Sequence, residues 1–308
     1  MSDAGLSPIE REAMRAVRAK NLRGETWPRP DRRRVVAVAN QKGGVGKTTT
    51  TVNMAVALAS HGLGVLVVDL DPQGNASTAL GIDHRVGVPG TYDVLLHAVP
   101  VQDVAVQSSE APSLWCVPAT IDLAGADIEL ATQDGRETKL REAIASFAAL
   151  ADRMDYILID CPPSLGLLTL NALVAADEML IPIQCEYYAL EGLAQLLTTV
   201  DLVKAHLNPS IGVGSVLLTM YDSRTKLADQ VASEVRGHFG DVVLDAVIPR
   251  SVRVSEAPGY GQSVITYDGG SRGAVRYVEA AEQFARRRGA TAPAPTPSTT
   301  HDPNGTEA

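Results

Sequence analysis

The stretch VVAVANQKGGVGKTTTTVNMAVALASHG, residues 35–62, decides the fold of this chain. It begins with the apolar run VVAVA, continues with a glycine-rich turn at 42–46, and ends with a segment of helical character from Lys47 to about Gly62. A strand, a glycine-rich turn and a helix in this order form a loop in which backbone N–H groups face an anion. The stretch therefore predicts a phosphate-binding loop (P-loop).

The residues of the loop have separate expected roles. Because glycine has no Cβ, Gly43, Gly44 and Gly46 allow the curl that brings successive N–H groups together. Lys47 is expected to contact the β- and γ-phosphates, and the Thr48 hydroxyl to ligate Mg²⁺. Since glycine is about 7% of residues, K-G-G-x-G-K-[ST] arises by chance in a chain of this length at a rate on the order of 10⁻⁴. The predicted nucleotide contacts in the loop are Lys42, Gly43, Gly44, Val45, Gly46, Lys47, Thr48 and Thr49.

The loop departs from the pattern G-x-x-x-x-G-K-[ST], because Gln41 stands where the first glycine belongs and Lys42 follows it. A lysine on the near shoulder of the loop cannot easily curl onto phosphates that its own backbone cradles. It could reach the nucleotide of a second copy, as a cation supplied in trans stabilises the charge on a transferring phosphoryl group. Hydrolysis would then depend on dimerisation. The alternative is that Lys42 is a solvated loop lysine.

Outside this stretch, short apolar runs alternate with helical segments. The runs are residues 35–39, 64–70, 114–118, 156–161, 178–183, 213–220 and 242–248. Strands that are apolar on both sides and alternate with helices form a mainly parallel sheet with helices on both faces. The sequence thus predicts an α/β fold, a single twisted-sheet P-loop NTPase domain over residues 35–288.

The two ends of the chain differ from this domain in composition. Residues 1–34 form a basic extension with a short helical stripe, followed by WPRPDRRR. A loosely attached helix plus linker is one interpretation, and an arm that docks on a partner or touches DNA is the other. Residues 289–308 are rich in Pro, Thr and Ala, so we expect a disordered tail.

Charge and composition exclude several classes of protein. The 308 residues carry a net charge of −9, with 9 basic and 5 acidic side chains in residues 1–34 and 8 basic and 20 acidic ones in residues 35–218. Residues 219–288 carry 10 basic and 9 acidic ones. The acidic middle argues against a generally basic nucleic-acid-binding protein. Three cysteines without a C-x-x-C pair predict neither disulfides nor a zinc site. With no long apolar stretch and a charged N-terminus, we expect a cytoplasmic protein.

The loop sequence N-Q-K-G-G-V-G-K-T-T-T resembles the deviant Walker A motif of the ParA/MinD family of P-loop ATPases. Four further motifs are similar to the chromosomal ParA (Soj) branch of that family. They are V-D-L-D-P-Q-G-N (68–75), D-Y-I-L-I-D-C-P-P-S-L-G (155–166), T-M-Y-D-S-R-T (219–225) and I-P-R-S-V-R-V-S-E-A-P (248–258). The five motifs cover roughly residues 34–288. The resemblance implies ATP and Mg²⁺ as cofactors.

Two carboxylates follow strands of the predicted sheet. Asp71 comes before Pro72 and opens a polar turn, so it should project from the carboxyl edge, where ligands bind in open α/β sheets. The resemblance implies that Asp71 orients or activates the attacking water. Asp69, two residues earlier, faces the same side by strand alternation and is expected to be a supporting partner. Asp160 ends the run Y-I-L-I and has the form of a Walker B acid that holds Mg²⁺. An ordinary turn or strand-end aspartate is the alternative for each.

Several basic residues lie in the last third of the chain. The resemblance implies that Arg224 and Arg253 bind DNA without reading its sequence, by neutralising phosphates. Arg250 belongs to the same group of candidates, although Arg250 and Pro249 could instead border the adenine pocket. The alternative for the arginines is a surface ion pair with Asp222 or Glu256.

The resemblance implies a DNA-partitioning ATPase that acts on a chromosome or a plasmid. An ATP-dependent sandwich homodimer would bind double-stranded DNA in the nucleoid, and a ParB-type centromere-binding protein would stimulate its otherwise weak hydrolysis and release it. A polar scaffold protein is a further conceivable partner. One alternative is a MinD-like membrane-cycling ATPase that positions the division site; such relatives end in an amphipathic basic helix, whereas this chain ends in a polar tail. The other alternative is an ATP-gated DNA-binding scaffold or regulator.

Overall fold

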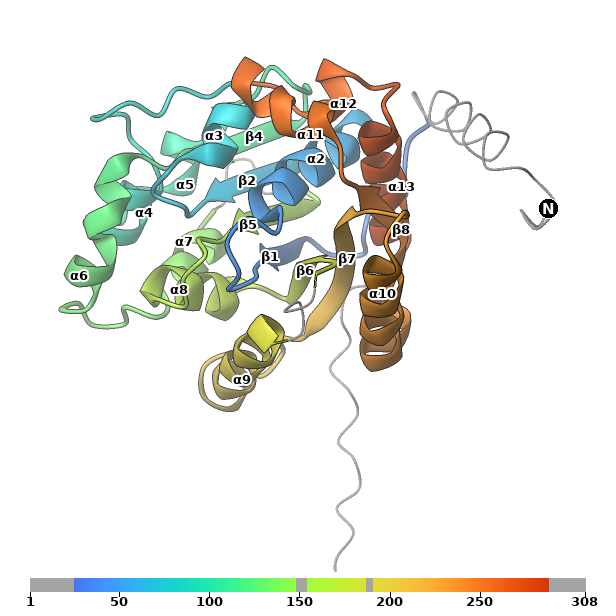
Figure 1. Cartoon of the computed structure of the whole chain (residues 1–308). Coiled ribbons are helices and arrows are strands. Elements are labelled where there is room, and N and C mark those ends of the chain that lie inside the picture. The colour runs from blue at the N-terminus through green and yellow to red at the C-terminus, as the bar shows by residue number, and fades with distance from the viewer. Residues whose placement is uncertain (1–24, 148–153, 187–190, 288–308) are drawn as a thin grey trace, which may run out of the picture.

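The computed structural model describes residues 25–147, 154–186 and 191–287. Within them, one sheet of eight strands has the order β3-β4-β2-β5-β1-β6-β7-β8 (Figure 1). The strands are β1 (Arg34–Val38), β2 (Val65–Asp69), β3 (Val106–Gln107), β4 (Leu114–Val117), β5 (Tyr156–Asp160), β6 (Glu178–Gln184), β7 (Val213–Tyr221) and β8 (Val243–Pro249). Neighbouring strands are parallel except β3 and β4, which are antiparallel.

Two apolar clusters cover the two faces of the sheet. On β1, Val36 and Val38 belong to one cluster and Val35 and Ala37 to the other, because successive side chains of a strand point to opposite faces. The first cluster includes α2 (Lys47–Ser60), α3 (Asn75–Ala79), α12 (Val264–Tyr267) and α13 (Arg272–Arg286). The second includes α4 (Thr91–Leu96), α5 (Val101–Val104), α6 (Ala126–Leu130), α7 (Lys139–Ala145), α8 (Leu167–Ala175), α9 (Glu191–His206) and α10 (Lys226–Phe239). Short helices η1 (Ile121–Gly125), η3 (Gly240–Val242), α11 (Val252–Glu256) and η4 (Ala257–Tyr260) complete the described structure.

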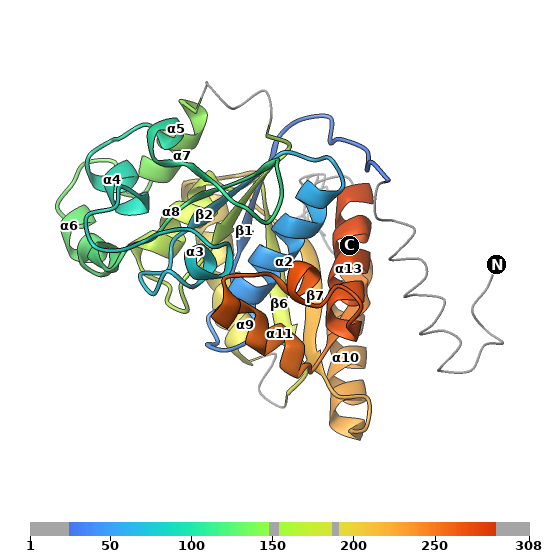
Figure 2. The same ribbon diagram turned by 90° about the horizontal axis from the view of Figure 1, so that it is seen from above.

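The predicted mainly parallel sheet with helices on both faces is confirmed. Each of the seven predicted runs forms a strand with bounds close to those expected. Strand β3 was not predicted, because its two residues are both exposed and form no apolar run. Figure 2, seen from above, shows α2 and α13 on one side of the sheet and α8 and α9 on the other.

The segment before β1 contacts the edge of the sheet at which the parallel strands begin. Trp27 is 3% exposed, and its ring stacks on the ring of His61 with 3.8 Å between the centroids. Three arginines pair with acids at the starts of β5 and β6: Arg29 with Asp155 at 3.8 Å, Arg32 with Asp177 at 3.5 Å and Arg34 with Glu178 at 2.6 Å. Trp27 and Arg34 are therefore packed on the domain, while the side chains of Arg29 and Arg32 stay largely exposed, so an arm that docks on a partner or touches DNA stays a prediction. The predicted helix before this segment and the predicted tail lie outside the described residues.

None of the helices in the described part of the chain is long and apolar enough to cross a membrane.

Candidate nucleotide-binding site

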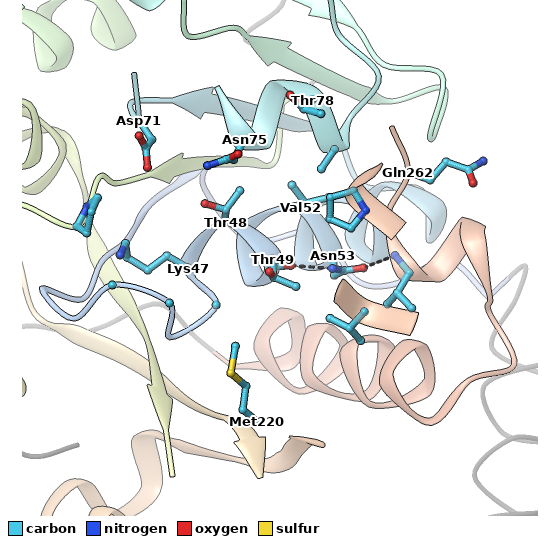
Figure 3. Close-up of a pocket in the computed structure, with 18 residues that line it drawn as sticks. Lys47, Thr48, Thr49, Val52, Asn53, Asp71, Asn75, Thr78, Met220 and Gln262 are labelled. Carbon is cyan, nitrogen blue, oxygen red and sulfur yellow. Dashed lines mark hydrogen bonds between the residues drawn. The ribbon is translucent and has the colours of Figure 1, made fainter. Parts of the chain in front are cut away.

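A pocket of about 350 Å³ opens at the carboxyl edge of the sheet, above the glycine-rich turn. Its lining residues are Gly43, Gly44, Gly46, Lys47, Thr48, Thr49, Val52, Asn53, Asp71, Asn75, Thr78, Ala79, Pro163, Met220, Val254, Pro258, Gln262 and Val264. Lys47 and Asp71 lie toward one end of it, and Asn53 and Gln262 lie toward the other (Figure 3). The pocket thus has a charged end beside the loop and a less charged end beside the segment 254–264.

The glycine-rich turn has the backbone that the sequence predicts. Gly44 and Gly46 have φ angles of 74° and 87°, in the left-handed region where a side chain is strained. Gly46 caps α2 without a side chain, so the first N–H groups of the helix face the pocket without a competing side-chain acceptor from the cap. The positive end of the helix dipole adds to this arrangement. The turn and the start of α2 therefore form a site suited to an anion.

Lys47 is buried at the base of the turn and is 7% exposed. Its Nζ donates to the carbonyl oxygen of Lys42 at 3.4 Å, which is a long hydrogen bond. Burial lowers the pKa of Lys47, while the negative charges of Asp160 and Asp71 oppose that shift. An ammonium group held by one weak contact between two carboxylates is well placed to bind phosphate oxygens.

Asp160 ends β5 directly below the start of α2. Thr51 Oγ1 donates to Asp160 Oδ1 at 2.8 Å, whereas Asp160 Oδ2 is buried with no hydrogen-bond partner among the described residues. Burial, and then the charge of Asp69, raises the pKa of Asp160, and the hydroxyl groups of Thr48 and Thr51 oppose the rise. A buried carboxylate oxygen that lacks a partner costs free energy unless a cation or donor meets it. The carboxylate and the Thr48 hydroxyl are oxygen ligands of the kind that Mg²⁺ prefers.

Asp71 follows β2 and lines the pocket, as the sequence predicts. Its Oδ1 accepts from Gln73 N at 3.0 Å, and its own N–H donates to Asp69 Oδ1 at 3.2 Å. Asp69 is fully buried and also accepts from the N–H and the hydroxyl of Ser77 at 2.9 and 2.7 Å. Burial raises the pKa of Asp69. Asp69 therefore contacts the backbone of Asp71, which is compatible with the predicted supporting role.

Lys42 lies on the outer shoulder of the turn with a third of its side chain exposed. Its Nζ donates to Glu186 Oε2 at 3.1 Å, and its backbone N–H donates to Asn40 Oδ1 at 3.0 Å. Lys42 does not line the pocket beside its own loop. The side chain of Lys42 is thus paired with Glu186, in the loop after β6 of the same chain, at the surface of the molecule.

The far end of the pocket contains residues that the sequence analysis missed. Asn53 on α2 donates to Thr49 O at 2.7 Å and accepts from Val264 N at 2.9 Å, so it ties the segment 254–264 to the phosphate-loop helix (Figure 3). Met220 faces the opening with a φ of 49°, which is unusual for a residue with a side chain. Val45, a predicted nucleotide contact, is 1% exposed and is not among the lining residues. Pro249, predicted to contact the nucleotide, is not among the lining residues; it borders another hollow instead.

The comparisons with known proteins agree with this geometry. A family model described as "AAA domain" (AAA_31) matches residues 33–213. The chromosome partitioning protein ParA of Myxococcus xanthus is 52% identical over 82% of this chain and 88% of that protein. The sporulation initiation inhibitor protein Soj of Bacillus subtilis is 52% identical over 82% of this chain and 98% of that protein. The chain belongs to the ParA/Soj family of chromosome-partitioning ATPases.

Solved structures give the same fold for this ParA/Soj family member. A structure titled cobyrinic acid a,c-diamide synthase from Mycobacterium smegmatis, with bound ATP analog and magnesium, is 40% identical with a TM-score of 0.71, over 82% of this chain and 95% of that one. The cell division ATPase MinD of Pyrococcus furiosus is 29% identical with a TM-score of 0.66, over 82% of this chain and 98% of that one. Both support the P-loop NTPase fold of this chain.

The arginines that the sequence analysis singled out lie away from the phosphate loop. Arg224 and Arg250 line a second hollow of about 900 Å³ between β7, β8, α10 and α13. The lining residues of this hollow are Tyr221, Asp222, Ser223, Arg224, Asp229, Ala232, Ser233, Arg236, Val247, Pro249, Arg250, Arg272 and Arg276. Arg253 does not line it. The structure therefore gathers five arginines in this hollow of the ParA/Soj fold, of which the sequence analysis singled out two.

Both of the expected surface ion pairs are present. Arg224 meets Asp222 through two hydrogen bonds of 2.8 and 2.7 Å, and the side chain is 85% exposed. Arg253 pairs with Glu256 at 3.1 Å and with Asp268 at 3.5 Å, and is 56% exposed. Exposed ion pairs contribute about 0–1 kcal/mol, so a stronger anion could replace either acid. The ion pairs therefore do not decide between the two interpretations of these arginines.

Proposed function

We propose that this ParA/Soj family member hydrolyses ATP with Mg²⁺ to drive the segregation of a chromosome or plasmid, as a dimer that binds DNA in the ATP state and that a ParB-type protein releases. The observation that carries the proposal is that Lys47 and Asp71 line the same end of one pocket, with the buried Asp160 near enough for its charge to raise the pKa of Lys47. The names and ligands of the relatives support it.

The residues fit the nucleotide and the metal ion. Gly43, Gly44 and Gly46 leave open space above the turn, since an added Cβ at any of them would meet no atom within 4 Å. Phosphates would occupy that space and accept from the N–H groups of the turn and of α2. Thr48 and Asp160 would hold Mg²⁺, with the unpartnered Oδ2 of Asp160 satisfied directly or through water. When bound, Mg²⁺ neutralises charge on the phosphates and orients them for in-line attack.

The chain's own side chains then perform the rest of the reaction. Lys47 binds phosphate oxygens and stabilises the negative charge that they carry in the transition state. Asp71 accepts a hydrogen bond from the attacking water and orients it, since its carboxylate is partly exposed at the pocket. Asp69 fixes the backbone of Asp71 through the 3.2 Å contact. Lys42 is free of the pocket in its own subunit and would be supplied to the site of a second copy.

The proposed dimer requires a change at Lys42. The ion pair with Glu186 holds this lysine on its own subunit, so the pair must open when Lys42 reaches a partner's phosphates. Because both side chains are substantially exposed, opening the pair costs little compared with what a triphosphate offers. Hydrolysis is accordingly slow in the lone subunit and depends on assembly. Dimerisation would thus control the rate of ATP hydrolysis.

The proposed DNA surface is the group of arginines beside β8. Arg224, Arg250 and Arg253 would contact phosphates and release counterions without reading bases. Two copies in an ATP-bound dimer double the number of such contacts, so DNA affinity rises with ATP. Localisation to nucleoid DNA follows from this affinity. A scaffold or regulator that binds DNA without hydrolysis would not require Asp71 at the pocket.

ATP hydrolysis measured with and without DNA and a ParB-type protein tests the proposal. We expect slow hydrolysis by the protein alone and an increase of about tenfold or more with DNA and the partner together. Stimulation by anionic lipid vesicles instead would select the membrane-cycling alternative. Unchanged hydrolysis in every mixture would reject the partner-stimulated cycle.

A further inference from the structure

The outer face of η1 and α6 exposes two large apolar side chains. Ile121 is 54% exposed and Ile128 is 77% exposed, whereas Leu123 and Leu130 on the same two elements are fully buried. The buried residues belong to the apolar cluster on this side of the sheet, and α6 contacts α4 and α8, so the exposed isoleucines lie outside that cluster. Exposed isoleucines in a short, otherwise ordinary helical segment leave apolar surface in water.

This face also carries negative charge. Asp122 and Glu129 on η1 and α6, and Asp134 in the turn that follows, are exposed acids, whereas Asp127 is half-buried and faces α8. Residues 121–137 contain one base, Arg136. The guanidinium of Arg136 is already engaged, with Glu137 at 2.9 Å and with Ala131 O at 2.7 Å. The surface therefore offers negative charge around two apolar side chains. Its complement is a basic segment that also carries apolar side chains.

Asp127 connects this face to the nucleotide pocket. Its Oδ1 accepts from Leu168 N at 3.1 Å, at the start of α8. A Cβ added at Gly166 would come within 2.6 Å of Asp127 Oδ2, so the carboxylate of Asp127 lies close against the backbone of Gly166. The loop that ends at Gly166 begins after Asp160, and its Pro163 lines the pocket. A displacement of α6 therefore reaches the loop beside the bound phosphates through one side chain.

We propose that the outer face of η1 and α6 is the docking surface for a basic, apolar segment of the partner protein, and that Asp127 passes the binding event to the loop 161–166. This inference rests on the proposed function, because the partner is the ParB-type protein that stimulates hydrolysis. DNA does not suit a surface of this charge. A second copy of the same face would be repelled by like charge.

The position of the face supports this assignment. In both views α6 lies at the end of the molecule away from α10 and α13, which line the arginine-rich hollow (Figures 1 and 2). A partner on α6 and DNA at the hollow would therefore occupy separate surfaces. Both could be bound at the same time, as stimulation by the two together requires.

The test measures ATP hydrolysis by the full chain with DNA while a purified ParB-type protein from the same organism is titrated in. Ile128→Asp is expected to raise the partner concentration for half-maximal stimulation by about tenfold, since one well-buried apolar contact is lost and a like charge is added. Hydrolysis without partner should stay within about twofold of wild type, because Ile128 touches no part of the pocket. Leu202→Asp is the matched control, as Leu202 is 60% exposed on α9, and it should behave as wild type.

Asp127 is tested by a different readout. Asp127→Ala is expected to bind the partner at the wild-type concentration but to lower the maximal stimulation by about fivefold or more, because Leu168 N loses its acceptor. Asp127→Asn keeps an acceptor oxygen and should restore most of the stimulation. Circular dichroism and thermal unfolding verify that both variants fold.

Each outcome bears on the assignment. If Ile128→Asp retains the wild-type half-maximal concentration, the docking surface is elsewhere, although stimulation of the wild type would still support the proposed function. If Asp127→Ala is stimulated fully, Asp127 is not the connection. If the partner does not stimulate the wild type at all, the proposed function fails and this docking surface fails with it.

Discussion

Asp69 and Asp71 are two residues apart on one strand end, yet their surroundings give them different chemistry. Asp69 is fully buried and accepts hydrogen bonds from Ser77 and from the backbone of Asp71, so it is a structural acceptor. Asp71 keeps part of its carboxylate at the pocket surface. A carboxylate that positions water needs that access. Exposure, more than sequence spacing, therefore distinguishes the two roles.

Asp71→Ala is predicted to lower ATP hydrolysis by about tenfold or more, which corresponds to about 1.4 kcal/mol of transition-state stabilisation or more. ATP binding should be retained, because the turn at 42–46 and Lys47 are unchanged. Phosphate release and binding of a fluorescent ATP analogue measure the two effects separately. Asn75→Ala, at another lining position, serves as the control. Wild-type turnover in Asp71→Ala would remove this residue from the mechanism.

The ion pair with Glu186 holds Lys42 on its own subunit. Glu186→Gln removes the charge that holds Lys42 on its own subunit, so the ATP-dependent dimer should form at a protein concentration up to about fivefold lower. Analytical ultracentrifugation with ATP and with ADP measures the dimer fraction. Lys42→Ala should have the opposite effect and abolish ATP-dependent dimers. A concentration dependence identical to wild type in Glu186→Gln would show that the ion pair does not restrain assembly.

Among the elements, the start of β1 is held by an ion pair inside the protein, whereas the ion pairs of Arg29 and Arg32 before it lie at the surface. Arg34 is 5% exposed in its side chain and pairs with Glu178 at 2.6 Å, and Arg34 Nη1 also donates to the carbonyl oxygens of Phe284 and Arg287 at 3.1 Å each. Its guanidinium lies 4.3 Å from the centre of the Phe284 ring. One arginine thus joins β1, β6 and the end of α13.

Arg34→Met is predicted to lower the free energy of unfolding by about 3–5 kcal/mol, because it leaves the Glu178 carboxylate buried without its partner. The double variant Arg34→Met with Glu178→Met should be destabilised less than Arg34→Met alone, since no unpaired charge remains. Urea unfolding followed by circular dichroism measures all three proteins. If the double variant is less stable than Arg34→Met, the penalty does not come from the buried charge.

Sequence reasoning succeeded where neighbouring residues decide the structure. The strands and α2 were predictable because buried parallel strands are continuous apolar runs and the loop residues are adjacent in the chain. It failed where contacts join distant residues. The hydrogen bond between Asn53 and Val264 spans 211 positions, and the ion pair of Arg34 with Glu178 spans 144. No local pattern reports that Asn53 holds the far wall of the pocket or that Arg34, the first residue of β1, is neutralised inside the protein.

At the scale of the whole molecule, charge is separated between the two ends of the sheet. The acidic face at η1 and α6 lies at one end, and the arginines beside β8 lie at the other (Figure 1). A net charge of −9 would repel DNA if it were spread evenly. Separation allows an acidic protein to present one surface to DNA and another to a basic partner. Global composition alone, which suggested only an acidic protein, does not reveal this.

Arg224→Glu combined with Arg253→Glu is predicted to weaken DNA binding by about tenfold or more while ATP binding is retained. Each phosphate contact that is lost should also reduce the slope of log K against log salt concentration by about 0.9. Fluorescence anisotropy with duplexes of two unrelated sequences, at several salt concentrations, measures both quantities and shows that the loss is independent of sequence. Both arginines lie outside the nucleotide pocket, so the ATP affinity should not change.

Arg85→Glu is a close control, because Arg85 is 86% exposed and pairs with Asp83 as Arg224 pairs with Asp222. Arg85 lies outside the arginine-rich hollow, and its loss changes the net charge in the same direction. If Arg85→Glu lowers DNA affinity by as much for each unit of charge as the double variant does, the loss of affinity comes from net charge. Arg224 and Arg253 would then not form a specific DNA-binding surface. If the double variant binds DNA with the wild-type slope, the DNA surface is elsewhere on the dimer. Loss of affinity and slope in the double variant alone would assign the phosphate contacts to Arg224 and Arg253.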